Sequence, residues 1–187
     1  MVKKIKTCIF ISGTGSNLES IIKSSREYNF PIKVELIISN NINAKGIKLA
    51  KKYSIPYKFF SSKNKKKFER KCLYEIKKNN IKFLCLAGFM NILSNSFIKL
   101  FRYKIINIHP SLLPKYKGLN THKRVLENNE KYSGCTVHFV SSKLDSGKII
   151  LQKKVLIEKN ESEKSLKKKV LMQEHKLYPQ SIISLFK

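Results

Sequence analysis

Short apolar runs alternate with segments of helical spacing along the first part of the chain. The runs at residues 5–11, 34–38, 83–87 and 104–108 predict strands, and a shorter extended piece is expected at 56–60. The run at 83–87 is continuously apolar, as a strand buried on both faces of a sheet requires. At least some of these strands are therefore expected to lie between two layers of helices.

The segments between these runs carry apolar residues three or four positions apart. They predict helices around Leu18 and Ile21, across residues 43–53, around Phe68 and Cys72, and across residues 94–101. Regular alternation of strands and helices is typical of a parallel sheet with helices on both faces.

The pattern changes at Tyr132. Cys135, Val137 and Phe139 alternate with other residues, as in a strand with two different faces, and a second extended stretch covers residues 149–157. We expect these two segments to extend the sheet as antiparallel or mixed strands, since they follow one another without a helix.

A final helix is predicted by the spacing of Leu166, Val170 and Leu177. The expected fold class is therefore α/β and Rossmann-like: a mostly parallel central sheet with helices on both faces and a mixed C-terminal part. A length of 187 residues fits one domain, 1–187. In such folds ligands bind at the carboxyl ends of the strands.

The formal net charge of +27 suggests nucleic acid as a partner. Only Arg26, Arg70, Arg102 and Arg124 are arginines, however, and the lysines are spread along nearly every segment. Proteins that read bases use arginine forks and stacking aromatic residues at defined places. The dispersed lysines are more typical of solvated surfaces, so no specific nucleic acid is expected, and a basic RNA-binding module is the rival from another class.

The chain starts at Met1 and runs directly into an apolar segment of about seven residues, too short to span a bilayer. We expect a cytoplasmic protein that does not enter a membrane. The four cysteines are far apart and include no C-x-x-C pair, which predicts buried free thiols. The histidines show no metal-ligand spacing, so no metal is expected.

The main candidate for chemistry is the pair Asn107 and His109, two residues apart at a predicted strand end, followed by a loop that contains Pro110 and Pro114. Side chains two positions apart on a strand point the same way. An amide donor beside an imidazole suits a reaction that develops negative charge on a carbonyl oxygen. The alternative is that both groups are merely solvated or bonded to the next loop.

A glycine loop follows the first predicted strand, at Gly13 and Gly15. It resembles a dinucleotide fingerprint, but Leu18 stands where the third glycine would be. Backbone N–H groups at a helix start, with Ser16 and Asn17 as caps, suit a phosphate monoester. A simple tight turn is the alternative.

Several segments together resemble the folate-dependent formyltransferases. The strongest is Asn107-Ile108-His109-Pro110-Ser111-Leu112-Leu113-Pro114 with the trailing Gly118. The others, in the same order and at compatible spacings, are residues 11–18, 86–93, 134–140, 144–147, 173–175 and 178–179. The resemblance covers essentially the whole chain and implies the formyltransferase variant of the Rossmann-like fold.

The resemblance implies transfer of a formyl group from 10-formyltetrahydrofolate, as co-substrate, to the amine of phosphoribosylglycinamide in purine biosynthesis. It implies Asn107, His109 and Asp145 as the catalytic residues, with Asp145 orienting His109. His138 and His122 are weaker candidates, and His138 is expected to support the site through a hydrogen bond. The expected partners are small molecules, with the chain a monomer or a weak homodimer.

The resemblance also implies two binding sites. Phosphoribosylglycinamide would be bound by Gly15, Ser16, Asn17 and Glu174. The folate would be bound by Lys65, Met90, Asn91, Ile92, Leu93, Asn107, Ser141, Ser142, Lys143, Leu144 and Asp145. This sequence departs from many relatives at Lys65, Asn91, Asn120 and Leu171, and it ends at Lys187 without the usual tail.

Two other branches of the same superfamily are the closest rivals. Methionyl-tRNA formyltransferases carry an added C-terminal domain, and formyltetrahydrofolate hydrolases carry an added N-terminal domain. The phosphate-type loop at residues 13–17 favours a small phosphorylated acceptor instead.

Overall fold

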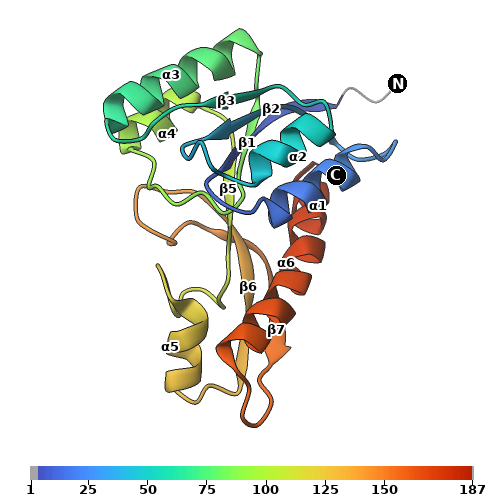
Figure 1. Ribbon diagram of the computed structural model, residues 1–187, viewed down its shortest axis with the longest axis vertical. Helices are drawn as coiled ribbons and strands as arrows, with labels where there is room; N and C mark the ends of the chain where they lie inside the picture. The colour runs from blue at the N-terminus through green and yellow to red at the C-terminus, as the bar shows by residue number, and fades with distance from the viewer. Residues whose placement is uncertain (1–3, 187) are drawn as a thin grey trace.

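Seven strands form one sheet in the computed structural model, which describes residues 4–186 (Figure 1). The strands are β1 (Ile5–Ile11), β2 (Ile32–Ser39), β3 (Tyr57–Phe59), β4 (Phe83–Leu86), β5 (Ile105–His109), β6 (Tyr132–Phe139) and β7 (Ile149–Leu156). Their order is β3-β2-β1-β4-β5-β6-β7. The first five are parallel, β6 is antiparallel to β5 and β7 to β6, which confirms the predicted mixed C-terminal part.

The helices lie on both faces of the sheet, as predicted (Figure 1). They are α1 (Ser16–Ser25), α2 (Gly46–Lys52), α3 (Lys65–Lys78), α4 (Asn95–Phe101), α5 (Thr121–Glu127) and α6 (Glu163–Phe186). One core layer contains buried residues of α1, α2 and α6, and the other contains those of α3 and α4. The fold is therefore α/β and Rossmann-like.

Residues 8–11 of strand β1 show why this part of the sequence is continuously apolar. Ile9 and Ile11 belong to the α1/α2/α6 layer, whereas Cys8 and Phe10 belong to the α3/α4 layer. Successive side chains of a strand point to opposite faces, so both sets are buried. All four cysteines of the chain are buried free thiols, as predicted.

Helix α6 is fixed to the sheet by Tyr178. This side chain is fully buried, and its hydroxyl donates to the carbonyl oxygens of Leu86 at 2.9 Å and Ile106 at 3.2 Å. A buried phenol needs such acceptors to offset its desolvation. The contact holds α6 across β4 and β5, close to the ends of these strands that carry the candidate site.

One element was not predicted. Helix α5 lies in the segment between β5 and β6 for which the apolar pattern indicated only a loop. Its seven residues bury Thr121, His122 and Val125, of which only Val125 is aliphatic. A helix with so narrow an apolar stripe gives no detectable period.

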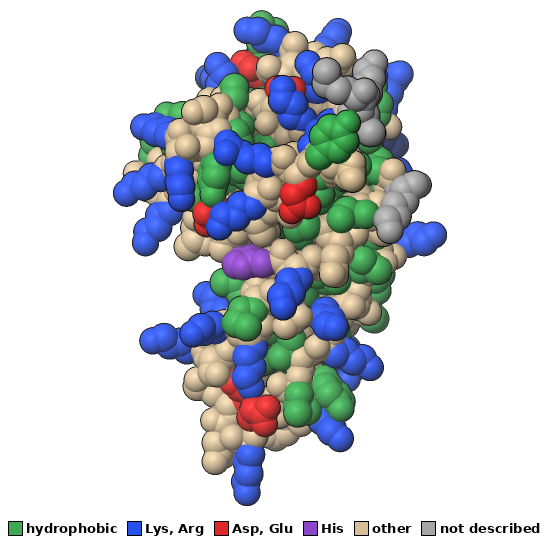
Figure 2. Space-filling model, turned by 90° about the vertical axis from the view of Figure 1, so that its right-hand side faces the viewer, with side chains coloured by type: hydrophobic (Ala, Val, Ile, Leu, Met, Phe, Trp, Pro, Cys, Tyr) green, Lys and Arg blue, Asp and Glu red, His purple; other side chains and the backbone are tan. Residues whose placement is uncertain are grey.

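On the face that Figure 2 shows, basic side chains are spread rather than gathered in one patch. Figure 2 shows basic side chains distributed over one whole face, with acidic ones at few places. No helix in residues 4–186 is both long enough and apolar enough to cross a membrane. The expectation of a cytoplasmic protein rests partly on the first residues of the chain. Residues 1–3 lie outside the described range.

Candidate active site

The candidate residues gather at the carboxyl ends of β1, β4 and β5, where the strand order changes direction between β1 and β4. Such a point leaves a crevice between the loops that run to opposite faces of the sheet. Asn107 and His109 both belong to β5, and only 6% of His109 is exposed. The predicted position of this pair at a strand end is confirmed.

His109 lies between two oxygen acceptors. Its Nε2 is 2.9 Å from the carbonyl oxygen of Tyr116, and its Nδ1 is 3.4 Å from Oδ2 of Asp145. A carbonyl oxygen can only accept, so Nε2 carries the hydrogen of the bond to Tyr116. The carboxylate of Asp145 lies beside the other ring nitrogen of His109.

Asp145 connects two loops around this imidazole. Its side chain is 8% exposed, and its Oδ2 also accepts from the N–H of Gly118 at 2.9 Å. Lys117 donates to the hydroxyl of Ser146 at 2.6 Å, which adds a second bridge between the loops. A Cβ at Gly147 would lie 1.7 Å from a backbone oxygen, so this turn requires glycine.

His138 orients the amide of Asn107. The Nδ1 of His138 donates to the carbonyl oxygen of Phe139 at 2.9 Å, so its Nε2 is free to accept from Nδ2 of Asn107 at 3.2 Å. Burial lowers the pKa of His138, which keeps the ring neutral and able to accept. The second amide hydrogen of Asn107 remains for a ligand. The predicted supporting hydrogen bond of His138 is confirmed.

The glycine loop approaches another backbone closely. Gly15 has a φ of 81°, and a Cβ there would lie 2.7 Å from Cα of Gly46. Helix α1 begins immediately after it, so the backbone N–H groups of its first turn have no partner within the helix and could bind an anion.

The predicted capping by Ser16 and Asn17 was wrong. Gly15 is the N-cap, no side chain caps α1, and Ser16 and Asn17 are its first helical residues. Asn17 instead donates from Nδ2 to Oε2 of Glu174, in α6, at 2.6 Å. Burial raises the pKa of Glu174. The structure thus brings together two of the residues expected to bind the phosphorylated substrate.

The segment after β4 presents apolar side chains to solvent. Met90 is 67% exposed and Ile92 54%, whereas Leu93 is buried and Asn91 partly buried. The N–H of Met90 donates to the hydroxyl of Ser12 at 2.8 Å, so this backbone donor is already engaged. Exposed apolar side chains beside a crevice suit an aromatic ligand.

The other expected folate residues lie in two places. Ser141, Ser142, Lys143 and Leu144 form the loop before Asp145, and the Ser141 hydroxyl donates to the Lys143 carbonyl oxygen at 3.0 Å. Lys65 is the exposed first residue of α3. Within the described part of the chain it makes no hydrogen bond or ion pair with another candidate residue.

Two participants were not assigned a role from the sequence. The carbonyl of Tyr116 contacts His109 through backbone, which no side-chain pattern reveals. Ser12 accepts from Met90, and its hydroxyl donates to Oδ1 of Asn40 at 2.6 Å. In residues 4–186 no three metal-binding side chains are close enough together to hold an ion.

The sequence of this chain is similar to those of known formyl transferases. A family profile described as Formyl transferase matches residues 5–182. The phosphoribosylglycinamide formyltransferase of Escherichia coli K12 is 39% identical, over 95% of this chain and 85% of its own length. The trifunctional purine biosynthetic protein adenosine-3 of Homo sapiens is also 39% identical, over 96% of this chain, but the chain spans only 18% of that relative.

The fold of this chain is similar to solved structures of phosphoribosylglycinamide formyltransferases. The crystal structure of phosphoribosylglycinamide formyltransferase from Campylobacter jejuni superposes with a TM-score of 0.93 at 34% identity, with both chains fully covered. The corresponding enzyme from Brucella melitensis gives 0.93 at 35% identity, covering 98% of this chain and 96% of its own.

Proposed function

The chain belongs to the formyl transferase family, and from this premise we propose that it transfers the formyl group of 10-formyltetrahydrofolate to the amine of phosphoribosylglycinamide. The observation that carries the proposal is the pair of acceptors around His109, together with the amide of Asn107 two residues away. In this arrangement one developing oxyanion would accept from the amide of Asn107 and from the Nε2–H of His109, a hydrogen that it would share with the carbonyl oxygen of Tyr116.

In the proposed reaction the neutral amine attacks the formyl carbon, and a new C–N bond forms. The amide of Asn107 and the imidazolium of His109 stabilise the resulting oxyanion. The intermediate collapses when the bond between the formyl carbon and N10 of the folate breaks, and the proton lost by the amine is delivered to N10. Asp145 holds the imidazolium and assists this proton movement.

The two substrates would bind on either side of these residues. The phosphate of phosphoribosylglycinamide fits the start of α1 at Gly15, Ser16 and Asn17, with Glu174 near its ribose. The folate would contact the exposed apolar segment at residues 90–93 and the loop at 141–144, and Lys65 would attract its glutamate tail. Holding both substrates together supplies much of the rate enhancement.

The direct test removes one catalytic group at a time. We expect His109→Ala, Asn107→Ala and Asp145→Ala each to lower kcat by on the order of 10² or more, with far smaller changes in KM. The double variant His109→Ala with Asp145→Ala should lose little beyond the worse single variant, because Asp145 acts through His109. Near-normal turnover in His109→Ala would exclude this mechanism.

The acceptor is tested by following tetrahydrofolate formation spectrophotometrically with and without phosphoribosylglycinamide. We expect product only with this acceptor. Equal product in its absence would indicate a hydrolase. Formylation of methionyl-tRNA at a comparable rate would contradict the choice of phosphoribosylglycinamide as the acceptor.

A further inference from the structure

The carbonyl of Tyr116 that accepts from His109 is held in an unusual backbone conformation. Tyr116 has a φ of 55°, in the left-handed region that residues other than glycine rarely adopt. The hydroxyl of Ser111 donates to the same carbonyl oxygen at 3.3 Å and to that of Lys115 at 2.8 Å. A conformation of this kind persists only where surrounding contacts impose it.

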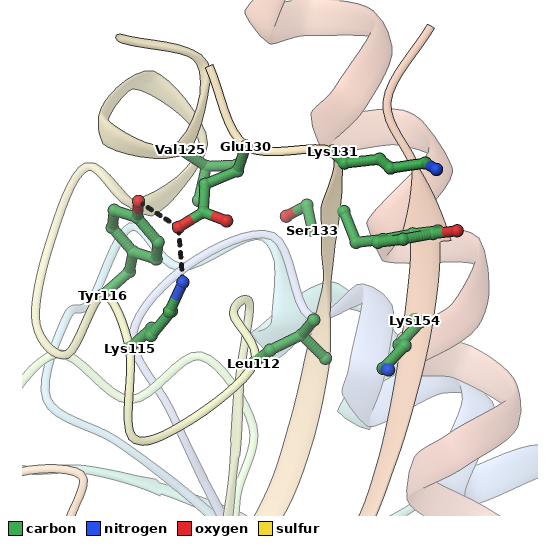
Figure 3. A pocket seen from close by; sticks show the side chains of 9 residues that line it. Leu112, Lys115, Tyr116, Val125, Glu130, Lys131, Ser133 and Lys154 are labelled. Atoms are coloured by element: carbon green, nitrogen blue, oxygen red, sulfur yellow. Dashed lines mark hydrogen bonds and ion pairs between the residues drawn. The ribbon is translucent and has the colours of Figure 1, made fainter. Parts of the chain in front are cut away.

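Glu130 supplies the side-chain contacts. Its Oε1 accepts from the hydroxyl of Tyr116 at 2.9 Å and from Nζ of Lys115 at 2.7 Å (Figure 3). We call Glu130, Lys115 and Tyr116 the Glu130 cluster. The cluster joins the loop after β5 to the residues between α5 and β6, so Glu130 restrains both neighbouring loop residues from one point.

The ionisation of the cluster is well defined. The hydrogen bond from Lys115 lowers the pKa of Glu130, and that of Lys115 is raised by the same contact. Desolvation and the carboxylate of Glu130 raise the pKa of Tyr116. The carboxylate therefore stays charged and the phenol stays a donor across the physiological range.

Apolar packing does not hold Tyr116 on all sides. A pocket of about 210 Å³ borders the cluster, with Leu112, Val125 and Ser133 among its walls (Figure 3). The guanidinium of Arg124 lies 5.4 Å from the ring centroid of Tyr116 and donates to the carbonyl oxygen of Lys117 at 2.7 Å. The ring packs against the core on one side, and since the pocket leaves space beside it, the polar contacts help to fix its position.

We infer that Glu130 is a positioning residue for His109, acting through the Tyr116 carbonyl. This inference rests on the proposed function, because it concerns the position of the same imidazole. The order of contacts is Glu130 to the Tyr116 hydroxyl, the Tyr116 carbonyl to His109, and His109 to Asp145. Glu130 touches neither substrate nor the reacting atoms.

The consequence for catalysis follows from the groups around His109. The Tyr116 carbonyl oxygen accepts from Nε2, and the carboxylate of Asp145 lies beside Nδ1. His138 and, from α5, His122 are neighbours whose pKa values burial lowers. Loosening the Tyr116 carbonyl should let the imidazole of His109 leave the geometry that the reaction needs.

The test compares Glu130→Ala with Glu127→Ala as a matched control. Glu127 is an exposed carboxylate of α5 that pairs only with Lys123, at 3.7 Å, among the described residues. We expect Glu130→Ala to lower kcat by on the order of tenfold, with both KM values changed less than about twofold. A loss in kcat at nearly constant KM separates a positioning role from a general loss of structure, and Glu127→Ala should match the wild type.

Tyr116→Phe is the second variant, since it removes only the hydroxyl and keeps the Lys115–Glu130 pair. It should lower kcat with little change in KM, as in Glu130→Ala, and combining it with Glu130→Ala should add little. If Glu130→Ala proves unstable in thermal unfolding, Tyr116→Phe alone decides. Wild-type kcat in Tyr116→Phe, or equal losses in Glu130→Ala and Glu127→Ala, would overturn the inference.

His109→Ala is measured in parallel to separate the two proposals. An inactive His109→Ala beside a normal Glu130→Ala would overturn the role of Glu130 alone. An active His109→Ala would overturn the proposed function, and this inference with it.

Discussion

Two imidazoles of the site have different roles set by their neighbours. His109 lies between a carbonyl oxygen, which accepts from its Nε2, and the carboxylate of Asp145. His138 donates to a carbonyl through one nitrogen and accepts from Asn107 through the other, and its lowered pKa keeps it neutral. The Nε2 of the same residue type thus donates in one position and accepts in the other.

The acceptor role of His138 gives a residue-scale prediction. His138→Phe should lower kcat by about tenfold, because the Asn107 amide loses the partner that orients it. His138→Gln should restore much of this loss, since a glutamine carbonyl can accept at the position of Nε2. Steady-state kinetics at saturating substrates measure both variants, and equal losses in the two would contradict the role assigned to the hydrogen bond.

At the scale of elements, Ser12 joins the segments that follow three neighbouring strands. Its N–H donates to the Gly88 carbonyl at 3.1 Å and its carbonyl accepts from Nδ2 of Asn41 at 3.1 Å. Its hydroxyl contacts Asn40 and Met90. The proposed phosphate loop, the end of β2 and the proposed folate segment therefore share one residue.

Removing this hydroxyl should affect binding more than chemistry. We expect Ser12→Ala to raise KM for the folate several-fold and to change kcat little. The N–H of Met90 and Oδ1 of Asn40 would lose their partner, at a cost of about 1 to 3 kcal/mol. Ser25→Ala is the control, since that hydroxyl only donates to Ile22 within α1. A loss confined to kcat would show that Ser12 acts on the catalytic groups instead.

The sequence predicted elements whose apolar faces are wide and missed features decided by tertiary contact. The strands of the sheet, and Asn107 and His109 at the end of one of them, follow from the alternation of residues. Helix α5 has too few apolar residues, and Asn17 does not cap α1 because Gly15 is the N-cap, so Asn17 lies inside the first turn and its amide donates to Glu174. The Tyr116 carbonyl is a backbone group, so its role depends on a loop conformation.

At the scale of the whole molecule, the net charge of +27 matters for encounter with substrates. A phosphate and a glutamate tail are both anionic, so a cationic surface attracts them before contact. Dispersed lysines produce such a field without any defined patch. The same field attracts nucleic acids weakly and without sequence preference.

Added salt should therefore slow the encounter between protein and substrate and leave the rate of the chemical step unchanged. Between about 20 and about 200 mM NaCl we expect kcat/KM for the phosphorylated acceptor to fall roughly tenfold, because screening weakens steering. The value of kcat should stay nearly constant, and a neutral osmolyte should have no comparable effect. Binding to unrelated DNA or RNA should disappear over the same range of salt. A salt-resistant complex with one RNA would contradict the view that the lysines form no specific nucleic-acid site.

Burial of histidines predicts how stability depends on pH. Burial lowers the pKa values of His122, His138 and His175 below 6.5, so the unfolded chain binds more protons. The free energy of unfolding should therefore fall as pH drops below about 6.5. Glu174 acts oppositely, because its raised pKa makes the folded state bind more protons as pH rises above 4.5.

Urea denaturation at several pH values between 7.5 and 5.5 measures this dependence. The double variant His122→Asn with His175→Gln should show a smaller slope, and Glu174→Gln a larger one. A flat profile in the unmodified protein would contradict the argument.

The alkylation rates of the four buried thiols report how the helix layers separate from the sheet. Cys8 and Cys72 lie in the α3/α4 layer, and Cys85 and Cys135 in the layer of α1, α2 and α6. Burial raises the pKa of each, so none reacts with a maleimide while its layer is closed. Alkylation followed by mass spectrometry therefore times the exposure of the two sides separately, and equal rates at all four positions would mean that both layers separate from the sheet in one cooperative event.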